Sequence, residues 1–300
     1  MPRCGHEPAR RRGRLHTGPR PSPGREPVSP LGTPPRDARA ARRHRPPPVP
    51  ARRRAAGPHA KIGWAQDQAG NDARWLPLLA PHLPLRLPTP EAVGEPGGGF
   101  PFRWSVTPWL DGASPAVGAL GADAARQLGE FVTALRAVST AGGPVKDGTS
   151  RGVPLARLDD GVRAAITESG TRIDSRAATK MWDQALAARP ATENYWIHGD
   201  LLPGNLLARG GSMTAVIDWG GVGVGDPAAD LIPAWTQFAG EERAAFRAVA
   251  ADGLTDSSDA WARGRGWVLV QAVIGLPYYW DRWPEFARAC QDRVAAVLAD

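Results

Sequence analysis

The chain has 300 residues, enough for one large domain or two modest ones with a buried core. It contains no run of eighteen apolar residues, so no membrane-spanning helix is expected. Its two cysteines, Cys4 and Cys290, lie far apart and lack metal-ligand spacing, which argues against a disulfide framework and indicates a reducing compartment, the cytoplasm. The basic start is not followed by an apolar segment, so no signal peptide is predicted.

Residues 1–60 differ in composition from the rest of the chain. They hold fifteen arginines against three acids, and they account for the positive sign of the net charge of +7. Pro, Gly and Ala dominate, so this segment cannot bury enough apolar area to become ordered, and it is predicted to be disordered. A nucleic-acid-binding tail is the less favoured reading, because no aromatic platform accompanies the charge. A GC-rich gene translated in the wrong frame at its start would also yield such a segment.

Several elements can be predicted from apolar spacing. Residues 121–138 place apolar side chains three and four apart, which predicts an amphipathic helix. Further helices are predicted over 154–166, 175–188 and 284–298. The glycine-rich run at 94–99 precedes a strand-like run rather than a helix, so it predicts a turn between strands and not a phosphate-binding loop.

The stretch from 195 to 231 predicts a strand, a loop and a hairpin. Residues 195–197 read as a short strand that leads into the loop. Residues 206–208 and 213–217 read as two strands joined by the tight turn Arg-Gly-Gly-Ser. The polar side chains of the stretch therefore lie on the loop or at the ends of the hairpin.

Because a hairpin returns its ends to the same place, Asn205 before it and Asp218 after it are expected to face one another. Two oxygen ligands placed in this way suit Mg²⁺, which takes its remaining ligands from water and nucleotide phosphates. Asp200 lies on the same loop and is suited to accept the proton of an attacking hydroxyl.

Three motifs of this stretch resemble the aminoglycoside phosphotransferase and choline-kinase-like family of small-molecule kinases. They are H-G-D-L-x-x-x-N at 198–205, I-D-W at 217–219 and G-D-P-x-x-D-L at 225–231. The resemblance covers roughly residues 62–300 and implies a protein-kinase-like, two-lobed α+β fold with a mostly helical carboxy-terminal lobe. It also implies ATP- and Mg²⁺-dependent phosphoryl transfer to a hydroxyl of a small, aminoglycoside-type molecule.

The resemblance implies a role for each polar residue of the stretch. Asp200 is the catalytic group that orients the hydroxyl, and Asn205 and Asp218 are the metal ligands. His198 is expected to organise the loop through its ring nitrogens. Asp226 and Asp230 are expected to cap a helix start and to brace the catalytic loop, because Asp226 precedes a proline as an N-cap residue does.

The amino-terminal lobe looks truncated or degenerate by comparison with the family. A complete lobe has a Gly-rich phosphate cover and a basic strand residue paired with a helix acid. Residues 61–112 have room for only part of such a lobe and the hinge, and residues 113–300 form the helical lobe. Asp72 falls where the helix acid is expected, whereas Lys61 reads better as a solvated lysine than as the basic partner.

Residues 102–111 are similar to the last strand of that lobe and the hinge. By analogy, the carbonyl of Pro108 would accept a hydrogen bond from the adenine, and the amide of Leu110 would donate one. Pro108 lacks an N–H but keeps its carbonyl, so it does not prevent this pairing.

In family members, residues corresponding to 231–300 form the acceptor pocket together with the catalytic loop. A cationic acceptor would use carboxylates, and those available are Glu241, Glu242, Asp281 and Glu285. A quaternary amine would use an aromatic cage, for which the candidates are Tyr278, Tyr279, Trp280 and Trp283. Aromatic side chains at helical spacing are more often part of a core.

A second function remains open at this point. A chain without the Gly-rich loop and the basic strand residue could be a non-catalytic, pseudokinase-like remnant that folds but transfers nothing.

Overall fold

A computed structural model describes residues 68–254 and 256–300, which belong to the second of two compact units, Pro48–Asp300. The first unit lies outside the described residues. The predictions made for residues 1–60 and for Lys61 concern that undescribed part of the chain and stay predictions.

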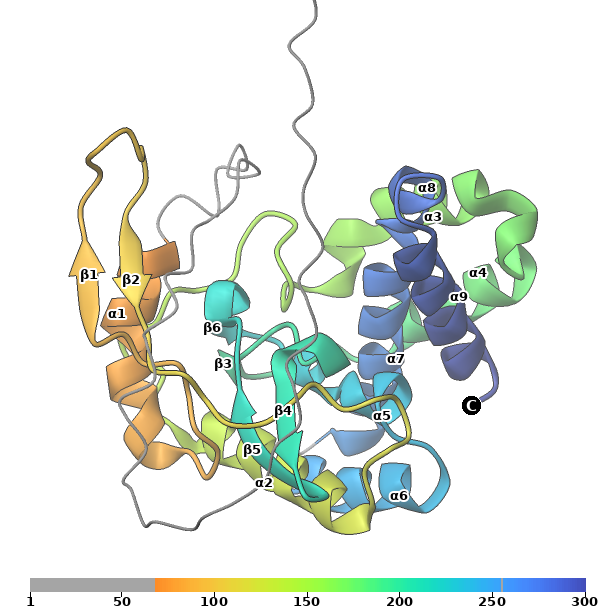
Figure 1. The fold of residues 1–300 in the computed structure, drawn as a ribbon. Coiled ribbons are helices and arrows are strands. Elements are labelled where there is room, and N and C mark those ends of the chain that lie inside the picture. Colours follow the sequence, from red (N-terminus) through yellow and green to blue (C-terminus); the bar gives the residue numbers. More distant parts are fainter. Residues whose placement is uncertain (1–67, 255) are drawn as a thin grey trace, which may run out of the picture. The chain divides into compact units, whose positions relative to one another are not determined.

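The described chain begins with a helix and a strand pair (Figure 1). Helix α1, Gln68–Leu79, continues into the short 3-10 helix η2, Ala80–His82. Strands β1, Ala92–Gly94, and β2, Trp104–Val106, pair antiparallel, and α1 packs against both of them. The turn predicted at 94–99 therefore lies between two strands, as expected.

Helix α2, Ala122–Ala137, confirms the amphipathic helix predicted over 121–138. Its apolar side chains are buried, and it packs against helix α6, Gly240–Ala250. The same helix also contacts strands β3 and β5, so it supports the segment that carries the predicted catalytic residues.

The helix predicted over 154–166 is divided in two. A 3-10 turn, η3, spans Leu155–Leu158, and α3 begins at the next residue and spans Asp159–Ser169. The division arises at Leu158, where the backbone (φ −104°, ψ −1°) departs from α-helical values. Helix α4, Ser175–Ala187, ends one residue before its predicted end, and the carboxylate of Asp174 caps it by accepting the N–H of Ala177 at 2.9 Å.

The stretch from 195 to 231 contains two strand pairs. Strands β4, Leu206–Arg209, and β5, Ser212–Val216, form the predicted hairpin, but they extend further towards its turn than expected. The turn is the pair Gly210-Gly211, and both residues have positive φ (60° and 83°), as two-residue hairpin turns require. Strand β3, Tyr195–Ile197, pairs antiparallel with β6, Gly223–Gly225, which the glycine-rich sequence did not predict.

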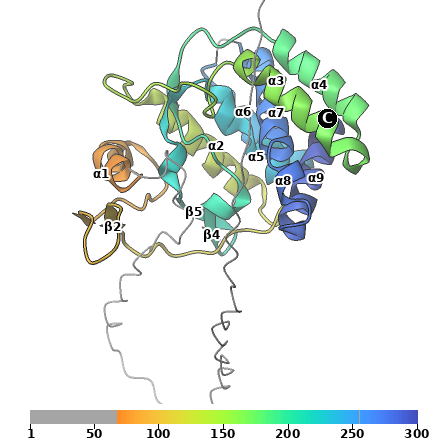
Figure 2. The same ribbon diagram turned by 90° about the horizontal axis from the view of Figure 1, so that it is seen from above.

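The carboxy-terminal region is helical, as expected, and α7 lies at its centre. Helix α7, Ser257–Val273, packs against α4 and α9 and is buried on most of its surface. No helix among residues 68–254 and 256–300 combines the length and the apolar character that a membrane span needs. Figure 2 shows the same helices from above. The other elements are η4 (Gly170–Arg172), η5 (Pro203–Asn205), η6 (Trp219–Gly221), η7 (Pro227–Leu231), α5 (Pro233–Thr236), α8 (Leu276–Tyr279) and α9 (Pro284–Leu298).

Candidate active site

The carboxylate of Asp230 accepts two hydrogen bonds from the backbone of the loop that follows β3. The backbone N–H of His198 donates to Oδ2 of Asp230, and the N–H of Gly199 donates to Oδ1, both at 2.7 Å. Burial raises the pKa of Asp230 to about 6, although the two N–H donors act in the opposite direction. Gly199 has φ 78°, a left-handed conformation that a side chain would strain. The structure thus places Asp230 in contact with the loop that it was predicted to brace.

The ring of His198 joins the loop that carries Asp200 to the residue that follows β5. Its Nε2 lies 3.1 Å from the carbonyl oxygen of Ile217, and its Nδ1 lies 3.2 Å from the amide nitrogen of Asp200. Because a carbonyl accepts and an amide donates, the ring is the neutral tautomer that carries its proton on Nε2. Burial lowers the pKa of His198 to about 4, which keeps the ring neutral. His198 therefore acts as a fixed crosslink in this structure.

Backbone pairing at the end of the hairpin places Asn205 next to the neighbour of Asp218. The N–H of Ile217 donates to the carbonyl of Asn205 at 2.9 Å, so Asp218 directly follows a residue bonded to Asn205. Among the described residues, Asp218 is the only non-glycine residue with positive φ (66°). That left-handed turn ends the strand and changes the direction of the chain at the carboxylate.

The chemistry of this pair fits Mg²⁺. The Nδ2 of Asn205 donates to the carbonyl of Asp200 at 2.8 Å, so Oδ1 is the side-chain atom that could bind a cation. Amide and carboxylate oxygens are the hard ligands that this cation prefers, and it usually takes one or two carboxylates together with phosphates. In the described part of the chain, no three His, Cys, Asp or Glu side chains gather into a metal site.

A cleft of about 590 Å³ opens beside Asp218. Pro108 and Leu110 of the predicted hinge lie in its wall, and Asp72 of α1 lies there as well. The apolar side chain of Leu207 lines the same cleft. Its volume is within the range of small-molecule and cofactor sites, and its mixture of apolar walls and a few polar groups is typical of them.

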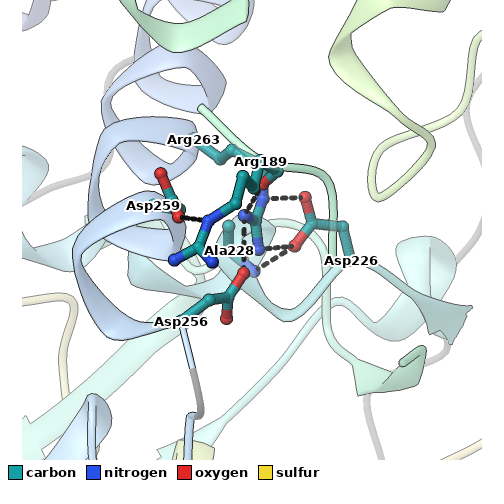
Figure 3. A network of polar contacts seen from close by, with 6 residues as sticks. All are labelled: Arg189, Asp226, Ala228, Asp256, Asp259 and Arg263. Atoms are coloured by element: carbon teal, nitrogen blue, oxygen red, sulfur yellow. Dashed lines mark hydrogen bonds and ion pairs between the residues drawn. The ribbon is translucent and has the colours of Figure 1, made fainter. Parts of the chain in front are cut away.

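Asp226 belongs to a buried ion-pair network, which Figure 3 shows. Its carboxylate accepts Nε of Arg263 at 2.8 Å and Nη2 at 3.3 Å, and both side chains are almost fully buried. It also accepts the N–H of Ala228 at 3.0 Å, so it caps η7 as predicted from the following proline. Arg263 also donates to Asp256 at 2.9 Å. This network joins the segment after the hairpin to α7.

Four side chains that the sequence analysis did not single out contact the predicted site residues or, in the case of Lys146, the backbone between Asp218 and Asp226. Nη1 of Arg151 lies 3.0 Å from Oδ2 of Asp200, and Nε2 of Gln68 donates to Oδ1 of Asp218 at 3.4 Å. Nζ of Lys146 donates to the carbonyl of Gly221 at 2.5 Å. Arg263, described above, is the fourth. Of the four, only Lys146 has a sequence feature that could have drawn attention to it, because it is one of only three lysines in a chain with 34 arginines.

The four candidate acceptor carboxylates do not converge. Glu241 and Glu242 lie in the first turn of α6, whereas Asp281 follows α8 and Glu285 lies in the first turn of α9. Figure 1 shows α6 and α8 at opposite ends of the helical region.

The aromatic candidates gather only in part. The rings of Tyr278 and Tyr279 are 4.8 Å apart, and Trp283 lies 6.1 Å from Tyr279. Trp280 instead lies under the guanidinium of Arg172, at 4.5 Å. Tyr278 and Trp283 are 58% and 53% exposed, so this cluster is not part of the core. The other tryptophans of the region, Trp235, Trp261 and Trp267, are buried.

The chain matches the model of the phosphotransferase enzyme family over residues 21–267. The match starts earlier in the chain than the resemblance drawn from the motifs, which began near residue 62, and it ends before residue 300. A comparison with proteins of curated function gives no match.

Solved structures of phosphotransferases share the fold. The GDP and kanamycin complex of APH(2")-IIia aligns with a TM-score of 0.60 and 19% identity, over 80% of this chain and 84% of that one. A thermostable mutant of APH(4)-Ia gives a TM-score of 0.54 and 18% identity, over 78% and 84%. Macrolide 2'-phosphotransferase MphH from Brachybacterium faecium gives 0.50 and 22%, over 78% and 82%. These likenesses confirm the predicted protein-kinase-like α+β fold.

Proposed function

Because the chain belongs to the phosphotransferase enzyme family, we propose that it transfers the γ-phosphoryl group of ATP, with Mg²⁺, to a hydroxyl of an aminoglycoside-type molecule. The observation that supports this proposal is the set of hydrogen bonds that joins Asp200 to His198 and Asn205, and both of these residues to Ile217, the neighbour of Asp218. The proposed cofactors are available in the cytoplasm, where we place the enzyme.

Asp200 is proposed to accept the proton of the acceptor hydroxyl. The hydroxyl oxygen forms a bond to the γ-phosphorus, the bond from that phosphorus to the bridging oxygen breaks, and its electron pair stays on the nucleoside diphosphate. Through a loose transition state this reaction needs positioning more than strong basicity. The bonds from the Asp200 amide to His198 and from Asn205 to the Asp200 carbonyl supply that positioning.

Asn205 and Asp218 would hold the metal through oxygen atoms, at the edge of the cleft lined by Asp218. A bound Mg²⁺ supplies neutralisation of phosphate charge. Pro108 and Leu110 would bind the purine through backbone groups, because both lie in the wall of the same cleft. One structural neighbour was solved with GDP and kanamycin, so both purine nucleotides should be tried.

The acceptor proposal rests on the family and on the segment from α8 to α9. Asp281 and Glu285 belong to this segment, as do the exposed side chains of Tyr278 and Trp283. Carboxylates attract the ammonium groups of an amino sugar, and aromatic faces favour cations.

The proposal can be tested without knowledge of the acceptor. We expect ATP or GTP with Mg²⁺ to raise the melting temperature, and Asp218→Ala to abolish the shift because it removes a metal ligand. Transfer of ³²P from labelled nucleotide should then be measured on a panel of aminoglycosides and macrolides. Absence of a thermal shift with every purine nucleotide, together with absence of transfer, would favour the non-catalytic alternative.

A further inference from the structure

Part of the loop between α2 and η3 is hydrogen-bonded at two places to strand β6 and the residue that follows it. The N–H of Val224 donates to the carbonyl of Pro144 at 2.8 Å, and the N–H of Lys146 donates to the carbonyl of Val224 at 2.9 Å. Further along the loop, the carbonyl of Gly152 accepts the N–H of Asp226 at 2.8 Å. Residues 144–152 are therefore held by the catalytic segment itself, although they lie about fifty residues before it in sequence.

The side chain of Lys146 reinforces this attachment. A Cβ on Gly223 would lie 2.9 Å from Cδ of Lys146, and a Cβ on Gly225 would lie 2.9 Å from Cγ of the same side chain. Glycine at these two positions of β6 admits the lysine stem, whose Nζ reaches the carbonyl of Gly221. Burial lowers the pKa of Lys146, and the nearby charge of Arg151 acts in the same direction.

The hydrogen-bonded loop at 144–152 places Arg151 next to Asp200. Nη1 of Arg151 lies 3.0 Å from Oδ2 of Asp200, and the two side chains are 41% and 21% exposed. The loop runs directly alongside Gly199, since a Cβ there would lie 3.6 Å from Cβ of Arg151, an ordinary van der Waals contact. Oδ1 of Asp200 is buried, which leaves Oδ2 as the carboxylate oxygen that a substrate can reach.

The accessible oxygen of the proposed proton acceptor is thus the one bound to a guanidinium. A carboxylate oxygen has two lone pairs, so Oδ2 can accept the acceptor hydroxyl while it stays bonded to Arg151. No Lys or Arg occurs in the catalytic loop from His198 to Asn205. The cationic group beside Asp200 therefore comes from a different element.

We propose that Arg151 is a positioning residue for the transfer step, which holds the Asp200 carboxylate with Oδ2 towards the acceptor hydroxyl. This inference rests on the proposed function. The hydroxyl bound to Oδ2 would lie beside the guanidinium, whose bond to the same oxygen fixes the direction in which the carboxylate accepts the proton.

The test compares Arg151→Ala and Arg151→Lys with a control that removes an equal charge nearby. Arg157→Ala is suitable, because Arg157 is exposed on η3 and lies only six residues further along the chain. For Arg151→Ala we expect kcat to fall about 100-fold, with KM for the nucleotide and the nucleotide-dependent thermal shift unchanged. Arg151→Lys should be intermediate, guanidinium ion should partly restore Arg151→Ala, and Arg157→Ala should match the wild type.

Other outcomes would overturn the inference. If the wild type is active and Arg151→Ala keeps the activity of Arg157→Ala, or exceeds it, Arg151 does not position Asp200. A loss of activity that guanidinium does not restore and that accompanies a lost thermal shift would indicate a structural role only. A wild-type chain that transfers phosphate to no acceptor would overturn the proposed function, and this inference with it.

Discussion

The amino-terminal and carboxy-terminal regions that contribute residues to the cleft differ in how their side chains are held. On the carboxy-terminal side, Asp200, His198 and Asp230 are connected by hydrogen bonds that are buried or partly buried. On the amino-terminal side, the β1–β2 pair carries an exposed ion pair between Arg103 and Glu95, with exposures of 44% and 68%. The groups proposed for chemistry are therefore preorganised by the fold, whereas the strand pair on the other side is lightly bonded.

The largest effect is expected on enzymatic activity, from a substitution in the carboxy-terminal region. Asp200→Asn keeps the shape of the side chain but removes the proton acceptor, so kcat should fall about 10³-fold. The melting temperature should change little, because the amide of Asp200 keeps its bond to His198. The matched control is Asp160→Asn, an exposed acid of α3. Activity within tenfold of this control would contradict the proposed role.

A second comparison concerns ion pairs on the two sides. Arg263→Ala leaves the carboxylate of Asp226 buried without its partner, which should lower the free energy of unfolding by about 3–5 kcal/mol. Arg103→Ala removes the exposed pair with Glu95 and should cost less than about 1 kcal/mol. Urea unfolding of both variants measures the contrast, and equal losses would refute it.

A third test uses pH on the catalytic side alone. The pKa of His198 is lowered from 6.5 to about 4, so its contribution to stability is lost as pH falls through that range. The pKa of Asp230 is raised from 3.8 to about 6, so its contribution has the opposite sign and increases as pH falls from 6. The two contributions should largely cancel in the wild type between pH 6 and pH 4.

Single substitutions should separate these contributions. As pH falls from 6 to 4, Asp230→Asn should lose stability relative to the wild type by about 1.4 kcal/mol per pH unit, and His198→Gln should gain stability relative to the wild type. Urea unfolding at pH 6, 5 and 4 gives the slopes. Three parallel slopes would show that neither group titrates with a shifted pKa.

The smallest effect is expected for the hydrogen bond between Gln68 of α1 and Asp218. The bond from Gln68 to Asp218 is long, at 3.4 Å, so it contributes little. Gln68→Ala should raise KM for the Mg²⁺-nucleotide complex less than threefold, which corresponds to about 0.5 kcal/mol. A tenfold increase would mean that α1 controls the metal ligand more tightly than this geometry indicates.

The sequence by itself determined the elements and residues that depend on short spacing. A strand, a loop and a hairpin lie within 24 residues. The hairpin brings Asn205 close to Asp218, because its tight turn returns the chain to the place where the hairpin began. The N-cap at Asp226 and the helix α2 could also be predicted from the sequence, because capping and amphipathic spacing depend on residues only a few positions apart.

Only the tertiary structure decided which distant groups complete the site. Strand β6 is rich in glycine and has weak strand propensity, yet it pairs because β3 and the loop at 144–152 lie on either side of it. Arg151 and Gln68 reach the two aspartates from elements 49 and 150 residues away in the chain. Contacts over such separations depend on how whole elements pack, and no local pattern of residues encodes them.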